Sequence, residues 1–103
     1  MPKLYEYLGI IIFFYSNEHQ PIHVHARHEG TESKIELVIK NGQVAKLVTK
    51  QVEGKRSLPK RKLKQFEKLT EKLADEIMQS WINYFVLNKS IVSKKLEGKL
   101  WKK

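Results

Sequence analysis

The hydrophobic periodicity of this chain changes once, at Leu58-Pro59, and this change limits the folds that are open to it. Before this point apolar residues alternate with polar ones, as Ile35 and Leu37 do, and a period of two indicates β-strands. After it they recur at three- and four-residue steps, which indicates an amphipathic helix. We therefore predict an α+β domain in which a small antiparallel sheet is covered by a C-terminal helix, or by a helix pair bent near Leu73.

Four strands are expected in the first half of the chain. The segments that favour them are LGIIIFFY at residues 8–15, HVHARH at 23–28, SKIELVIK at 33–40 and QVAKLVTKQV at 43–52, with a loop at 16–22. Asn41-Gly42, between the last two segments, is the strongest short hairpin signal because both residues tolerate a positive φ. The strands should therefore form a mostly antiparallel meander with a two-residue turn at Asn41-Gly42.

The helical half should begin near Pro59, which the first turn of a helix tolerates, with Ser57 as the N-cap. Its apolar stripe is wide enough to cover the sheet, so we interpret it as core and not as a cofactor site. The stripe consists of Leu63, Phe66, Thr70, Leu73, Ile77, Trp81 and Phe85.

The 103 residues suffice for one compact domain and are too few for two. We expect the domain to span residues 1–88, followed by a basic tail at 89–103 that could dock, lie on an anionic surface or stay mobile. The absence of cysteine excludes disulfides and thiolate metal sites and fits a reducing cytoplasm. The apolar run from Leu8 to Tyr15 is too short to cross a bilayer, so we expect no membrane span.

The net charge of +9 is unevenly distributed along the chain. Residues 1–54 carry six Lys/Arg and six Asp/Glu, whereas residues 55–103 carry fourteen and five. Such asymmetry suggests an anionic partner, either nucleic acid or an acidic protein, although a solvated lysine-rich helix would give the same pattern. The candidate RNA-binding residues are Lys60, Arg61, Lys62, Lys64 and Lys68.

All four histidines of the chain fall between His19 and His28. Strand alternation places His23, His25 and Arg27 on one face of the predicted strand 23–28, and His28 on the other. We therefore regard His28 as a surface residue outside the candidate site.

Three interpretations of the histidine cluster remain open. His23 and His25 share a face and could bind one divalent metal together with His19 or Glu18. Alternatively, paired imidazoles could act as acid and base in RNA cleavage, since histidine titrates near neutral pH. The candidate catalytic residues are His23, His25, Arg27, His19 and Glu18. In the third interpretation the imidazoles only hold neighbouring loops by hydrogen bonds, and no cofactor is required.

The segment Glu18-His19-x-Pro21-x-His23-x-His25 resembles a widespread bacterial family of small proteins, the domain-of-unknown-function family four-one-six-zero. Three further features resemble the family pattern: a glycine before an apolar strand (Gly9), a Leu-Pro pair before a helix (Leu58-Pro59) and a tryptophan near the end of that helix (Trp81). The resemblance therefore covers about residues 1–86. Members of this family often have genes beside that of another small domain. Some of these pairs are regarded as toxin–antitoxin modules, with this family as the toxin.

The resemblance implies a toxin-type protein with a cognate small antitoxin-like protein as its partner. Together with the basic half and the paired histidines, it leads us to expect a toxin that acts on or near RNA. The alternative is a non-enzymatic interaction module that binds a small protein or nucleic acid, and the third option is a His-ligated metal-binding protein. The chain departs from the family pattern after Asn88 and in a slightly longer segment at residues 53–57. The role of the tail is therefore not implied by the resemblance.

Overall fold

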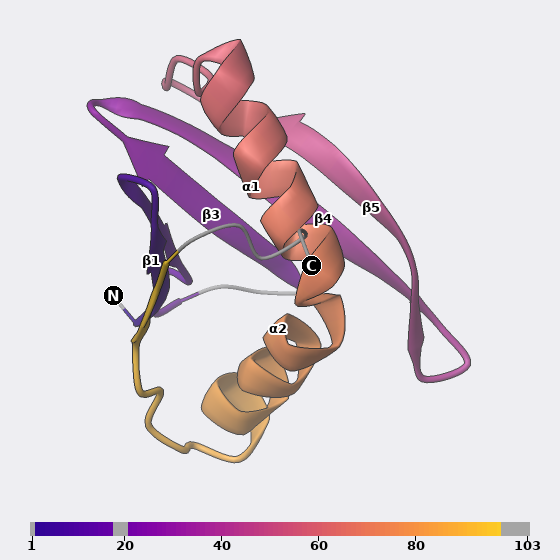
Figure 1. Cartoon of the computed structure of the whole chain (residues 1–103). Helices are drawn as coiled ribbons and strands as arrows, with labels where there is room; N and C mark the ends of the chain where they lie inside the picture. Colours follow the sequence, from indigo (N-terminus) through magenta and orange to yellow (C-terminus); the bar gives the residue numbers. More distant parts are fainter. Residues whose placement is uncertain (1, 18–20, 98–103) are drawn as a thin grey trace.

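The computed structural model describes residues 2–17 and 21–97, which form one six-stranded sheet with helices on one side (Figure 1). The strands are β1 (Lys3–Tyr7), β2 (Ile10–Phe13), β3 (His23–His28), β4 (Thr31–Lys40), β5 (Gln43–Gln51) and β6 (Lys94–Leu96). The helices are α1 (Lys60–Lys72) and α2 (Ala74–Trp81), followed by a π-helical turn, η1 (Ile82–Val86). The predicted α+β class is thus confirmed.

The strands lie in the order β5-β4-β3-β2-β1-β6, and each neighbouring pair is antiparallel except β1 and β6. The helices pack against one face of this sheet, where Ile12, Val24 and Ile35 meet Phe66 and Ile77 in the core. We call the opposite face, on which none of the described helices lies, the open face. Successive side chains along each strand point alternately to the helix-covered face and to the open face.

Three hairpins of the sheet close through the same kind of turn. Leu8-Gly9, Glu29-Gly30 and Asn41-Gly42 each have two consecutive residues at positive φ, as a two-residue primed turn requires. The predicted turn at Asn41-Gly42 is therefore confirmed.

The prediction of one strand at residues 8–15 is wrong. Leu8 and Gly9, with φ of 52° and 79°, form the turn between β1 and β2, so the apolar run belongs partly to a hairpin. Glycine populates this region of φ without steric cost, which lets the chain reverse here. With β1 and β6 included, the described residues form six strands and not the predicted four.

The predicted bend in the helical half is confirmed at Leu73, whose φ of −110° and ψ of 21° separate α1 from α2. Phe66, Ile77 and Trp81 are buried against the sheet, while Leu73 is only partly buried. The stripe predicted from helical periodicity is therefore core, as expected.

Ser57 is not the N-cap of α1. Pro59 occupies this position in an extended conformation, with φ of −54° and ψ of 149°, and no side chain caps the helix. The chain remains extended up to this residue because Leu58 is buried and its N–H donates to the Oγ of Ser33, 3.1 Å away.

The sheet continues beyond residue 88. Lys94–Leu96 forms β6 and pairs in parallel with Tyr5–Tyr7 of β1. The remaining residues of the tail, from 98 onward, lie outside the described part of the chain. None of the described helices is both long and apolar enough to cross a membrane.

Candidate functional site

One row of side chains crosses the open face from β2 to β5. The pairing registers place Phe13 opposite His25, His25 opposite Lys34, and Lys34 opposite Lys50. Residues directly opposite each other in neighbouring strands share a face of the sheet. The row therefore joins an aromatic ring, an imidazole and two ammonium groups that are far apart in the sequence.

His25 is hydrogen-bonded to a buried carboxylate. Its Nδ1 atom lies 3.1 Å from Oε2 of Glu32, which also accepts a hydrogen bond of 2.7 Å from the hydroxyl of Tyr15. Nη2 of Arg27 lies 3.6 Å from the other carboxylate oxygen. We call these four residues, His25, Glu32, Tyr15 and Arg27, the polar cluster.

Aromatic packing fixes the ring of His25 within this cluster. The ring stacks on Phe13 at a centroid distance of 5.5 Å and meets Tyr15 edge-on at 4.6 Å. The guanidinium of Arg27 lies 4.9 Å from the centroid of Phe13, a cation–π distance. His25 exposes only 4% of its surface and Glu32 only 1%, so both are held in a low-dielectric environment.

The hydrogen bonds also indicate the proton position on each described imidazole. Nδ1 of His23 lies 2.8 Å from the carbonyl oxygen of Pro21, and Nδ1 of His28 lies 2.9 Å from that of Gly9. Carbonyl and carboxylate oxygens only accept, so Nδ1 is the donor in each ring, His25 included. In the neutral form Nε2 is then the basic nitrogen, which is the arrangement of many catalytic and metal-ligating histidines.

His23 extends the cluster towards the helices. Its ring centroid lies 5.1 Å from that of His25 and 5.4 Å from that of Trp81 in α2. His23 exposes 8% of its surface. The structure thus brings the two predicted imidazoles together, and both are largely buried.

His28 lies apart from this pair, on the opposite face of the sheet, as alternation predicted, and this is the face on which the helices pack. Its ring packs against Gly9, where an added Cβ would lie 3.5 Å from the imidazole. Its bond to the carbonyl oxygen of Gly9 connects β3 to the β1–β2 turn. The side chain of His28 is thus partly covered and contributes to the hairpin, not to the polar cluster.

Glu18 and His19 lie outside the described residues. Within residues 2–17 and 21–97, no three histidine, aspartate or glutamate side chains lie close enough to hold a metal ion. A metal site at His23 and His25 would therefore need His19 or Glu18 as a further ligand, and it remains a prediction.

The polar cluster alters the acidity of Tyr15. Burial raises the pKa of its hydroxyl above the ordinary value, and the hydrogen bond to Glu32 acts in the same direction. Arg27 opposes this effect by favouring the phenolate. The hydroxyl therefore remains a hydrogen-bond donor to the carboxylate over the physiological pH range.

Sequence reasoning missed Glu32 and Tyr15. Tyr15 was included in the apolar strand 8–15, and the strand that contains Glu32 was predicted to begin one residue later, at Ser33. The available signal was alternation, which places Glu32 with Lys34 and Glu36 on the face opposite to that of Ile35 and Leu37. The position of Glu32 opposite Arg27 is set by the register of β3 and β4.

The five basic residues predicted to contact RNA all belong to α1. Lys62 donates from Nζ to the carbonyl oxygen of Leu8 at 2.6 Å and is tied to the β1–β2 turn. Lys64 and Lys68 line a hollow of about 330 Å³ between α1 and β5. The exposed members are Lys60, Arg61, Lys64 and Lys68. α1 lies on the face of the sheet opposite to that of the polar cluster.

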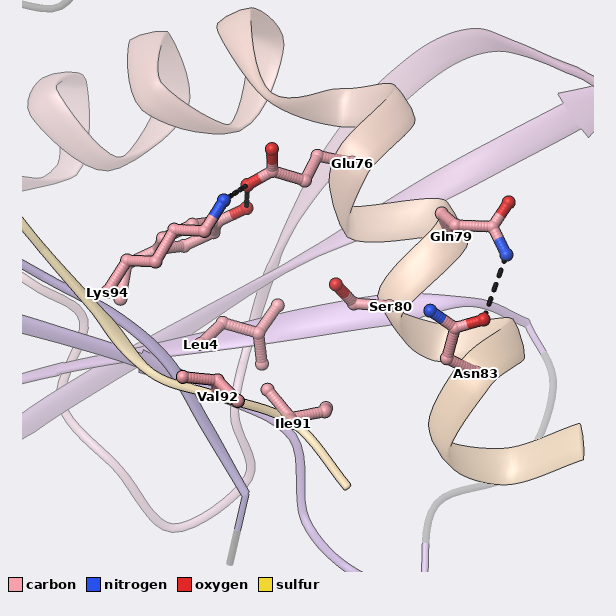
Figure 2. A pocket seen from close by; sticks show the side chains of 9 residues that line it. Leu4, Glu76, Gln79, Ser80, Asn83, Ile91, Val92 and Lys94 are labelled. Carbon is pink, nitrogen blue, oxygen red and sulfur yellow. Dashed lines mark hydrogen bonds and ion pairs between the residues drawn. The ribbon is translucent and has the colours of Figure 1, made fainter. Parts of the chain in front are cut away.

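A smaller crevice of about 170 Å³ lies between α2, β1 and the segment before β6. Figure 2 shows Leu4, Ile91 and Val92 on one side of it and Ser80 and Asn83 on the other. The hydroxyl of Tyr5 donates to Oε1 of Glu76, and Nζ of Lys94 lies 3.4 Å from the same oxygen. These contacts join β1, α2 and β6, so we interpret the crevice as the seam between them.

Comparison with known proteins places the chain in a family. A family model described as "Domain of unknown function (DUF4160)" matches residues 9–82, which include β2 to β5, the polar cluster and both α-helices. Neither the search of curated proteins nor the search of solved structures gave a match. The family model covers well over half of the sequence, and the chain therefore belongs to the DUF4160 family.

Proposed function

We propose that this protein acts on or near RNA, in the cytoplasm, as the toxin-type component of a two-protein bacterial module. The toxin assignment is supported by the resemblance of its Pro-x-His-x-His segment, residues 21–25, to family members that occur in such pairs. A net charge of +9 supports an anionic target, because summed positive charge steers polyanions to a protein surface.

The observation that carries the RNA target is the exposed cationic face of α1. Lys60, Arg61, Lys64 and Lys68 fall within roughly 100° of the helix circumference, because each residue turns an α-helix by about 100°. The exposed Glu71 falls in the same arc, so positive charges still exceed negative ones there by three. Among the described residues, none of the four has an ion-pair partner within 4 Å. Their charges are therefore available to phosphates.

Salt-dependent binding tests this proposal directly. The protein is titrated into a fluorescein-labelled oligouridylate, and the dissociation constant is measured over a range of salt concentrations. Each phosphate contact releases a counterion, so Lys64→Gln should reduce the slope of log K against log salt by about one unit. Lys89→Gln, at an exposed lysine outside α1, is the matched control. Absence of RNA binding by the unaltered protein would refute the proposal.

One observation favours the second candidate function, a non-enzymatic interaction module. His23 and His25 expose only 8% and 4% of their surface, which suits imidazoles that hold a fold better than imidazoles that reach a large substrate. Co-expression with the product of the adjacent gene distinguishes the two functions. A stable complex without growth arrest or RNA cleavage by the free protein would favour the interaction module.

A further inference from the structure

We infer that the open face of the sheet holds the RNA segment next to His25, with Lys34 and Lys50 as its phosphate-binding residues. This inference rests on the proposed function, since it assumes that RNA is the target. It adds a surface that the sequence did not indicate, because residues 1–54 have no net charge.

The first argument is the position of Lys34 in the row across the open face. Lys34 lies opposite His25 on one side and opposite Lys50 on the other. The Cβ atoms of directly opposed residues are roughly 4.5–5.5 Å apart. A phosphate held between the two ammonium groups would therefore lie over β4 and β5, next to the strand that carries His25, whose ring exposes 4% of its surface.

The second argument is the repulsion within this row. Like charges directly opposite each other destabilise a sheet, so Lys34 and Lys50 weaken the free protein. Nζ of Lys50 lies 3.6 Å from Glu36, but Lys50 is 50% exposed, and such surface pairs contribute little. Among the described residues Lys34 has neither an ion pair nor a side-chain hydrogen bond. A bound anion would remove this repulsion.

The third argument is the separation of charge between the faces. In β3, β4 and β5 the side chains on the open face include five cations and two carboxylates, which leaves three more positive than negative charges. The cations are Arg27, Lys34, Lys40, Lys46 and Lys50, and the carboxylates are Glu32 and Glu36. Of the other described acids of the first half, Glu6 lies on the same face, opposite Ile11 in β2, and forms an ion pair with Lys3. Glu29 lies in a turn and Glu53 lies beyond β5. A net charge of zero along the sequence thus hides a cationic surface.

RNA fits this surface better than an acidic protein does. The cationic row ends at an imidazole whose proton position is fixed, and an acidic protein would have no use for that group. Arg27 is 40% exposed and lies over Phe13, so its planar guanidinium remains available to a phosphate. Lysine and arginine contacts to phosphates position a nucleic acid without reading its sequence.

The cations of α1 do not serve this site. The helices cover the other face of the sheet, so the exposed side of α1 and the open face point in opposite directions. A phosphate bound at Lys64 or Lys68 is therefore separated from His25 by the helix layer and the sheet. Lys55 and Lys89, which are exposed and lie outside both α1 and the strands, provide a matched control with the same charge.

Protection from acetylation tests the inference on the unaltered protein. The full chain is treated with acetic anhydride, with and without saturating oligouridylate, and each lysine is quantified by mass spectrometry. We expect RNA to protect Lys34 and Lys50. If RNA binds but both lysines react at the same rate with and without it, the inference fails and the proposed function stands. If no RNA binds, both fail.

Paired variants give an independent measurement. Lys34→Gln/Lys50→Gln should weaken RNA binding by about tenfold at moderate salt, with a salt slope lower by about two units. It should also abolish the RNA-induced shifts of the His23 and His25 imidazole signals in NMR spectra, whereas Lys55→Gln/Lys89→Gln should retain them. Loss of the shifts in Lys55→Gln/Lys89→Gln alone would overturn the inference. The acetylation experiment is repeated with polyaspartate at the same total charge as the RNA. If polyaspartate protects Lys34 and Lys50 to the same degree as RNA, the open face binds an acidic protein and the inference fails.

Discussion

The Nδ1 atom of His25 lies 3.1 Å from the Oε2 atom of Glu32, and both side chains are almost fully buried. A carboxylate in this environment depends on its hydrogen-bond donors, because burial of an unpaired charge is costly. Tyr15 supplies the second donor to the same oxygen. The cluster thus joins the segment after β2 to β3 and β4, and it should contribute to stability whatever else it does.

Replacement of Glu32 by glutamine should therefore destabilise the protein. Glu32→Gln preserves the shape of the side chain but loses charge-assisted hydrogen bonds from His25 and Tyr15, so the free energy of unfolding should fall by about 2–3 kcal/mol. Urea denaturation at neutral pH measures this change. Glu36→Gln, in the same strand and only half-buried, is the matched control and should change stability by less than about 1 kcal/mol. Equal effects of the two substitutions would contradict a special role for Glu32.

The sequence predicted the α+β class, the Asn41-Gly42 turn and the bend at Leu73, because each depends on local chemistry or periodicity. It did not predict the separation of β1 from β2, since an apolar run of this length is typical of a single strand and the turn at Leu8-Gly9 is set by pairing across the hairpin. The same limit applies to the site. Alternation put His23 and His25 on one face, but only the register between strands brings Glu32 to His25.

The stability of the protein should fall at alkaline pH because of Tyr5. Burial raises the pKa of Tyr5 well above its ordinary value of 10.0, and the hydrogen bond to Glu76 adds a smaller effect in the same direction. The folded state therefore keeps a proton that the unfolded state loses near pH 10. The contribution of Tyr5 is fully present below this pH and is lost as pH rises further, by up to about 1.4 kcal/mol per pH unit.

Tyr5→Phe removes the titrating group and should make the loss of stability above about pH 10 shallower. Urea denaturation at a series of alkaline pH values measures the slope. Tyr84→Phe, at a half-buried tyrosine of η1, controls for the loss of a phenol hydroxyl. An unchanged slope in Tyr5→Phe would show that the buried hydroxyl is not linked to alkaline unfolding.

Trp81 should be a major contributor to the core between α2 and the sheet. It exposes 2% of its surface, and its ring centroid lies 5.3 Å from Phe14 and 4.4 Å from Phe85. Trp81→Ala should lower the free energy of unfolding by about 3–5 kcal/mol, as other large-to-small core substitutions do. Val86→Ala, at a residue 62% exposed in the adjacent η1, should change it by less than about 0.5 kcal/mol. An unaltered melting temperature in Trp81→Ala would show that this residue is not core.

Substitution of the histidines by asparagine should separate an acid–base role from a structural one. The amide of asparagine can occupy the place of Nδ1–H and donate to the same oxygen, but it does not titrate. If His25 transfers protons, His25→Asn should abolish RNA cleavage or growth arrest, while RNA affinity changes by no more than about twofold, because a group that acts in the transition state need not bind the ground state.

The matched control is His28→Asn, which replaces the same kind of Nδ1 hydrogen bond, here to the carbonyl oxygen of Gly9, on the helix-side face. It should retain both activity and binding. Growth arrest on induced expression, RNA cleavage and binding of labelled oligouridylate are measured for each variant, and urea denaturation establishes that each is folded. If His25→Asn is folded and fully active, the imidazole serves only to hold Glu32, and the polar cluster is structural. If affinity and activity fall together in His25→Asn but not in His28→Asn, His25 binds RNA rather than transferring a proton.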